Sequence, residues 1–149
     1  MNICIKVIPE SQHRKEVSGA DWFFDAKGDL QVRISPMSDQ RYEAALMLHD
    51  VFEAILCRFS GVTVESVDRF DQKYYETHSD DLDAGDERDC PYRLEHMYAT
   101  AAERIFAGAV GICWADYDRE LATTYPGPTA IRLKKGARKP SARPAKAHR

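Results

Sequence analysis

Alternating apolar and polar positions dominate the first 35 residues, a pattern that is typical of half-buried β-strands. Apolar side chains recur at every second position in residues 2–8 and again in the second half of residues 21–35. The turn inside the latter segment contains Gly28, which suits a backbone with positive φ, so we expect residues 21–35 to form a β-hairpin. The strand at 2–8 is expected to pair with it, giving an antiparallel sheet of about three strands.

A helical period replaces this alternation in the following part of the chain. The spacing of apolar residues predicts four helices, at about 40–58, 63–75, 91–110 and 114–122. Asp39 or Ser38 can cap the first helix, and Pro91 suits the first position of the third. Strands that precede helices in this way indicate the α+β class.

Two of the predicted helices carry apolar stripes, which we expect to be their buried faces. On the first helix the stripe contains Ala45, Leu48, Phe52, Ile55, Leu56 and Phe59. On the third helix it contains Leu94, Tyr98, Ala101, Ala102, Ile105, Phe106 and Ala109.

The charge of the 149-residue chain is divided unevenly between its two parts. Every acidic residue lies in 1–131, which carries a net charge of −11, whereas 132–149 carries +8. Such asymmetry is typical of an appended arm. We therefore expect a single domain over 1–125 and a disordered basic tail over 126–149.

This charge distribution also limits the expected partners. The tail has no aromatic side chain to stack on bases, so contact with nucleic acid would be weak and electrostatic, and the acidic body would repel phosphates. No run of 18 apolar residues and no signal segment is visible, so we expect no membrane contact and a cytoplasmic location.

Candidate metal ligands occur as two pairs on the first and third predicted helices. His49 and Glu53 are four residues apart and therefore share a face of the first helix. His96 and Glu103 share a stripe of the third helix that also contains small residues, which would let another helix approach closely. If these faces meet, two imidazoles and two carboxylates converge, which suits zinc or another divalent metal with an open position. A helix-edge hydrogen bond for His49 and a surface ion pair for Glu103 are the alternatives.

The order of strand and helix around these residues resembles known metalloproteins. Residues 28–34 followed by 44–56 resemble a minimal zincin, in which a strand precedes a helix with the motif H-E-x-x-H. They resemble more closely small phage-encoded proteins of unassigned function whose helix reads H-E-x-x-E-A. Two further segments are similar in these proteins: Val-Asp-x-Phe-Asp at 67–71, and Pro-Tyr…Glu-His…Glu-Arg between 91 and 104.

The resemblance implies a zincin-like metal site and, with it, a metal-dependent, peptidase-like hydrolase of phage or prophage origin. It implies that His49 is the first ligand, that Glu53 replaces the second histidine, and that His96 or Glu103 is the third ligand. Asp50 stands where the general-base glutamate of a zincin would be, and it is one methylene shorter. The carboxylate at Glu53 also lowers the preference for zinc, so a metal-binding protein without activity remains open.

Two other classes of protein compete with this interpretation. Residues 45–53 also resemble the metal-binding helix of HD-type phosphohydrolases, in which adjacent His and Asp residues both bind metal. Those enzymes are all-helical, so the hairpin expected at 21–35 places this alternative second among enzymes. The other class is a non-catalytic phage accessory protein that binds a host protein or nucleic acid, with His49 and Glu53 in structural roles.

Overall fold

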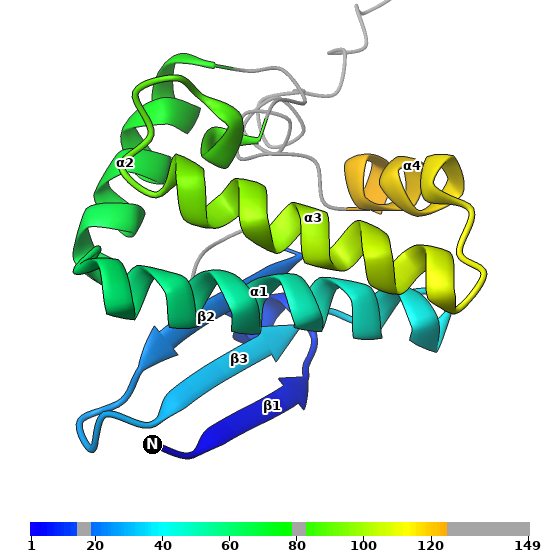
Figure 1. The fold of residues 1–149 in the computed structure, drawn as a ribbon, viewed down its shortest axis with the longest axis horizontal. Coiled ribbons are helices and arrows are strands. Elements are labelled where there is room, and N and C mark those ends of the chain that lie inside the picture. Colours follow the sequence, from blue (N-terminus) through cyan, green and yellow to red (C-terminus); the bar gives the residue numbers. More distant parts are fainter. Residues whose placement is uncertain (15–18, 79–82, 125–149) are drawn as a thin grey trace, which may run out of the picture.

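The computed structural model describes residues 1–14, 19–78 and 83–124. Three strands precede four helices, with short 3-10 turns at Glu10–Gln12 and Ala84–Asp86, so the predicted α+β class is confirmed (Figure 1). The elements are β1 (Ile3–Val7), β2 (Ala20–Phe24), β3 (Leu30–Ile34), α1 (Gln40–Ser60), α2 (Val64–Thr77), α3 (Arg93–Ala109) and α4 (Trp114–Thr124). The predicted basic tail over 126–149 lies outside the described residues.

The three strands form one mixed sheet in the order β1-β3-β2. The predicted hairpin is present, because β2 and β3 are antiparallel with Trp22 opposite Val32. The expectation of a wholly antiparallel sheet was wrong, because β1 runs parallel to β3, with Ile5 beside Val32. Strand β1 therefore pairs with the edge of β3 that faces away from β2. Alternation of apolar residues reports which face is buried, but not the direction of a strand.

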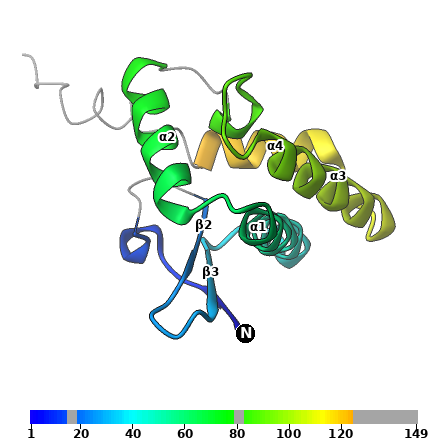
Figure 2. The same cartoon turned by 60° about the vertical axis from the view of Figure 1, so that its left-hand side comes forward.

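Helix α1 lies between the sheet and α3, as the view along α1 in Figure 2 shows. The main core therefore forms where α1 covers β2 and β3. It contains Leu30, Val32 and Ile34 of β3, which are completely buried, together with Ala54 and Cys57 of α1. This core fixes one side of α1, and α3 packs antiparallel to α1 on another (Figure 1).

The ends of the helices follow the local sequence closely. The side chain of Asp39 caps α1 by accepting a hydrogen bond from the backbone N–H of Arg41. Gly61 ends the same helix with a φ of 83°, a left-handed conformation that glycine adopts without a steric penalty. Helix α3 begins at Arg93 after Tyr92, two residues later than the start that Pro91 suggested.

The predicted buried faces of α1 and α3 were wrong in large part. Phe59 is 83% exposed and Ile105 is 75% exposed, although both belong to the predicted core stripes. Ala45 is buried as predicted. The other buried residues of α1 are Asp50, Glu53, Ala54 and Cys57, and those of α3 are Glu95, His96, Ala99, Glu103 and Ala107. Small alanines let the two helices approach closely, so the seam between them encloses short and polar side chains and leaves the bulky stripes outside.

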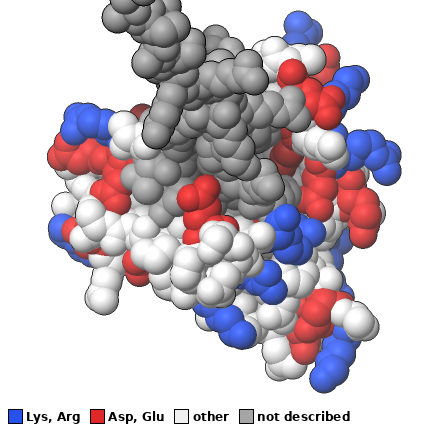
Figure 3. Space-filling model, turned by 180° about the vertical axis from the view of Figure 1, so that it is seen from behind, with Lys and Arg blue, Asp and Glu red and all other residues white. Residues whose placement is uncertain are grey.

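The surface opposite the view of Figure 1 carries charged residues of both signs beside uncharged ones. Figure 3 shows Lys and Arg interspersed with Asp and Glu over the part of that face that is not covered by grey residues. Among the described residues, no helix is long and apolar enough to cross a bilayer.

Candidate metal centre

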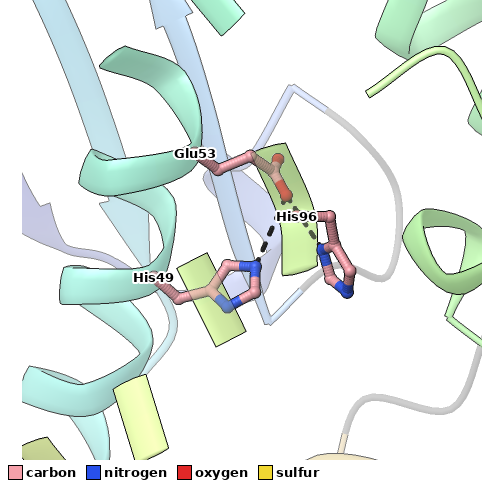
Figure 4. A group of neighbouring side chains, drawn as sticks. All are labelled: His49, Glu53 and His96. Atoms are coloured by element: carbon pink, nitrogen blue, oxygen red, sulfur yellow. Dashed lines mark hydrogen bonds and ion pairs between the residues drawn. The ribbon is translucent and has the colours of Figure 1, made fainter. Parts of the chain in front are cut away.

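His49, Glu53 and His96 form a buried group between α1 and α3 (Figure 4). One oxygen of Glu53, Oε2, lies 3.4 Å from Nε2 of His49 and 2.9 Å from Nδ1 of His96. The ligand atoms of the three residues all lie within 4.8 Å of one another, and no side chain of the group is more than 12% exposed. A group with this composition and spacing can hold a metal ion.

Helix geometry and small neighbours bring the three side chains together. His49 and Glu53 are one turn apart on α1, so both point toward α3. Ala99 lies one turn after His96 and is completely buried, which allows α3 to approach α1 closely. Gly85 packs on the other side of His96, where a Cβ atom would lie only 2.4 Å from Cγ of the imidazole. The 3-10 turn Ala84–Asp86 therefore covers His96 because residue 85 has no side chain.

Each member of the group has a further partner that orients it. The indole N–H of Trp22 donates a hydrogen bond of 2.9 Å to Oε1 of Glu53, the oxygen that does not face the imidazoles. Nδ1 of His49 lies 3.0 Å from Oε2 of Glu103. The hydroxyl group of Tyr117 on α4 donates to the other oxygen of Glu103. These contacts fix Glu53 and His49 with one atom of each directed into the centre.

The partner of His96 is of a different kind. Its Nε2 atom faces outward, 3.8 Å from Oδ2 of Asp83 and 3.7 Å from Oδ1 of Asp86. Both carboxylates are exposed and belong to the 3-10 turn or its N-cap. They supply negative charge near the outer edge of the His96 ring, beyond the range of a direct hydrogen bond.

The charges of the group stabilise one another against the cost of burial. Burial of His49 would lower its pKa, but hydrogen bonds to Glu103 and Glu53 raise the pKa well above 6.5. Burial would raise the pKa of Glu53, but hydrogen bonds from His49 and His96 hold that pKa at about 2. Burial opposes protonation of His96 too, yet its hydrogen bond to Glu53 raises the pKa. Glu53 is therefore ionised, and protons are attracted to the imidazoles around it.

The four predicted ligands lie together, as the two facing stripes required. His49, Glu53, His96 and Glu103 form one connected cluster, in which Glu103 contacts the nitrogen of His49 that points away from Glu53. Asp50, predicted as the general base, is buried on another side of α1. The pKa of Tyr117 on α4 is raised by burial, then by Glu103, and in part by the charge of Asp50.

Three functional contributors escaped the sequence analysis. Trp22 and Tyr117 come from β2 and α4, and no spacing in the sequence connects them to the helices that carry the ligands. Gly85 lies in the acidic segment between α2 and α3, where no local pattern indicates that its backbone packs against His96. The sequence could not reveal these three residues, because each contacts a cluster residue that is distant in the chain.

An open pocket of about 460 Å³ lies away from this centre, at the start of α2. Its lining includes Arg14, Phe24, Arg58 and Thr63, and none of its lining residues belongs to the His49, Glu53 and His96 group. Two of the lining arginines are already engaged, Arg14 with Asp21 and Asp68, and Arg58 with the carbonyl group of Gly28.

Comparison of the chain with protein-family models, curated proteins and solved structures gives no match. The resemblance to small phage-encoded zincin-like proteins therefore stays a prediction.

Proposed function

We propose that the protein binds a divalent metal ion through His49, Glu53 and His96. Two imidazoles and one carboxylate are the protein ligands of several catalytic zinc sites and of non-haem iron(II) sites, and both kinds keep open positions for other ligands. The observation that carries the proposal is that Oε2 of Glu53 faces a nitrogen of each imidazole, at 3.4 and 2.9 Å. A metal ion would replace the protons that those three atoms share.

The arrangement around the three ligands supports this proposal. Metal-binding histidines almost always pass their second ring nitrogen to a carboxylate or carbonyl group, which fixes the ring and its tautomer. Glu103 contacts Nδ1 of His49 in this way and is itself held by Tyr117. We therefore assign Glu103 the role of orienting His49, in place of the direct ligand role that the sequence suggested.

Hydrolysis is the activity that such a centre would support. A divalent ion held by three protein groups would supply Lewis-acid activation of water. In this proposal His49, Glu53 and His96 hold the ion, Glu103 orients His49, and Asp50 remains the predicted general base. A peptidase-like substrate and a phage origin are part of the same proposal.

The alternatives make different demands on the same residues. An HD-type phosphohydrolase would need Asp50 as a ligand, and Asp50 is not part of the group whose ligand atoms converge. A non-catalytic interaction protein would use the cluster only as a buried set of ion pairs. The contacts of Glu53 with both imidazoles support that alternative.

Metal content of the purified protein tests the proposal. Protein prepared without chelators or an affinity tag that binds metal should contain one divalent ion per chain, measured by elemental analysis after incubation with zinc, manganese or iron(II) and removal of excess. His96→Ala and Glu53→Gln should lose the ion. Glu95→Gln is the matched control, since Glu95 is a buried carboxylate beside His96 that lies outside the cluster.

Wild-type protein that takes up none of these ions would overturn the proposal and leave the cluster as a set of structural ion pairs. Equal loss of metal from Glu95→Gln would also count against it, because the loss would then follow from damage to α3 and not from removal of a ligand.

A further inference from the structure

Strand β1 forms a free edge of the sheet. It pairs on one side with β3, and among the described residues no strand pairs with its other side. In a parallel pair, alternate residues of a strand direct both backbone groups toward the partner strand. The carbonyl group of Asn2 and the N–H group of Ile8 both bond to β3, so the even-numbered residues face that strand. The N–H and C=O groups of Ile3, Ile5 and Val7 therefore point away from the sheet.

The side chains of the same three residues are apolar and partly exposed. In the parallel register they lie beside the three apolar residues of β3 that belong to the main core, so both sets share the sheet face that α1 covers. The β3 residues are completely buried, whereas Ile3, Ile5 and Val7 are between 39% and 46% exposed. The difference arises because α1 packs mainly on β2 and β3. Strand β1 thus presents unpaired backbone groups and an apolar face at the same edge.

The usual protections of a sheet edge are sparse on β1. Natural sheets discourage further pairing with charges, proline, a bulge or a covering segment. The five residues of β1 include no proline, pair with β3 without a bulge and carry one charge, that of Lys6. In Figure 1 no described element lies beside β1 on the side away from β3. The opposite edge of the sheet differs, because the guanidinium group of Arg14 donates a hydrogen bond to the carbonyl group of Trp22 on β2.

A second copy of β1 is complementary to this edge. A twofold axis perpendicular to the sheet at Ile5 places two copies of β1 antiparallel to each other. Ile3 of each copy then faces Val7 of the other, and the outward backbone groups form roughly six hydrogen bonds. Lys6 faces the uncharged Cys4 of the other copy in this register. A shifted register with Lys6 opposite Lys6 would be destabilised by repulsion between like charges, so the charge pattern favours the axis at Ile5.

We propose that two copies of the chain associate through the free edge of β1, so that their sheets join into one. The apolar side chains of both β1 strands then lie together on one face of the joined sheet. The contact is small, which predicts a weak dimer with a micromolar dissociation constant. No residue of β1 belongs to the cluster of His49, Glu53 and His96, so this proposal does not depend on metal binding.

Sedimentation velocity of the full chain at concentrations up to about 100 μM tests this dimer. The wild-type protein should change from monomer to dimer as its concentration rises. Ile5→Pro should weaken association at least about 30-fold, because it removes the N–H group directed at the other copy and spares the bonds between β1 and β3. Ile105→Lys is the control, since Ile105 is also an exposed isoleucine but lies on α3. It should dimerise as the wild-type protein does.

Ile5→Lys matches this control in its new side chain and should also be monomeric, because two like charges would meet at the twofold axis. Circular dichroism checks that both variants at position 5 remain folded. A wild-type protein that stays monomeric at about 100 μM would overturn the proposal. Dimers of Ile5→Pro and Ile5→Lys as strong as the wild-type dimer would also overturn it, because association would then use another surface.

Cross-linking tests the register of the two strands. Lys6 and Cys4 of the other copy form a non-hydrogen-bonded pair, in which the Cα atoms lie about 4.5 Å apart, a separation that suits a disulfide. Lys6→Cys in a Cys113→Ser background should therefore give a covalent dimer with oxidised glutathione, and peptide mapping should show a link between positions 4 and 6. Lys27→Cys in the same background is the control, because Lys27 is exposed outside β1. Equal linking of this control, or no link between positions 4 and 6, would contradict the proposed pairing.

Discussion

Nδ1 of His49 lies 3.0 Å from Oε2 of Glu103, on the edge of the imidazole that faces away from Glu53. A carboxylate in this position accepts the proton of Nδ1, so Nε2, which faces Glu53, is the nitrogen that a metal ion would bind after displacing its proton. The contact thereby selects the tautomer that a metal ligand at Nε2 needs.

Glu103→Gln should therefore weaken metal binding without abolishing it. Loss of such an orienting carboxylate costs about 10- to 100-fold in metal affinity. Competition with a chromogenic chelator measures the affinity, and elemental analysis at saturating metal measures the stoichiometry, which should remain at one ion per chain. Complete loss of metal from Glu103→Gln would instead make Glu103 a direct ligand.

His49→Ala should remove the metal and also destabilise the metal-free protein. The substitution leaves Glu53 and Glu103 buried with fewer partners, and breaking a buried ion pair in this way costs about 3 kcal/mol or more. Urea unfolding of the metal-free variant measures the loss. His49→Gln, which keeps a hydrogen-bonding side chain, should recover part of the stability but not the metal. A variant that retains metal would exclude His49 as a ligand.

The pairs of ligands could be predicted from the sequence because helical spacing alone places them. His49 and Glu53 share a face at four residues apart, and His96 and Glu103 share one at seven. The small residues Ala99 and Ala107 indicated which side of the third helix could approach a neighbour, and that side is buried.

The burial of the bulky stripes could not be predicted in the same way. Apolar periodicity alone does not show which face of a helix packs against the rest of the chain. Ile105 and Phe59 lie on apolar stripes and are nevertheless exposed. The direction of β1, and the roles of Trp22 and Tyr117, depend on contacts between distant segments, which leave no local pattern.

Asp50→Asn separates the two classes of enzyme that resemble this chain. In a zincin-like centre Asp50 acts on the reacting water, so the variant should keep its metal and lose hydrolytic activity. In an HD-type centre the same change removes a ligand and with it the ion. Elemental analysis and hydrolysis of a casein-derived peptide library compare the variant with the wild-type protein. Loss of metal would reverse the order in which we rank these two classes.

Metal affinity should rise as the pH increases from about 6 to 8. Burial disfavours a charged His49, yet its hydrogen bonds to Glu103 and Glu53 raise its pKa well above 6.5, so the metal must displace a proton. Each displaced proton changes the affinity by about tenfold per pH unit. Glu53, with a pKa of about 2, is already ionised and contributes nothing in this range. Tryptophan fluorescence measures binding, because Trp22 donates a hydrogen bond to Glu53, and a Trp114→Phe background removes the emission of the second tryptophan.

Stability of the metal-free protein should change in the opposite direction. The raised pKa of His49 means that its contribution to stability is complete below about pH 6.5 and is lost as the pH rises through the folded-state pKa. The contribution of Glu53 is complete above about pH 4.5 and is lost as the pH falls toward 2. Urea unfolding at several pH values measures both the loss of stability at high pH and the loss at low pH. Stability that kept increasing above pH 8 would contradict a protonated His49 in the folded protein.

Gly85→Ala should displace His96, although Gly85 is not itself a ligand. The new Cβ atom would lie 2.4 Å from Cγ of His96, so either the 3-10 turn Ala84–Asp86 or the imidazole must move. Such overpacking costs about 1–3 kcal/mol, and a displaced His96 would also weaken metal binding. Gly108→Ala is the control, since no atom lies within 4 Å of its added Cβ and alanine favours a helix. Urea unfolding and metal competition should show a lower stability and a lower metal affinity for Gly85→Ala and no loss of either for Gly108→Ala. An unchanged metal affinity in Gly85→Ala would mean that the turn does not position His96.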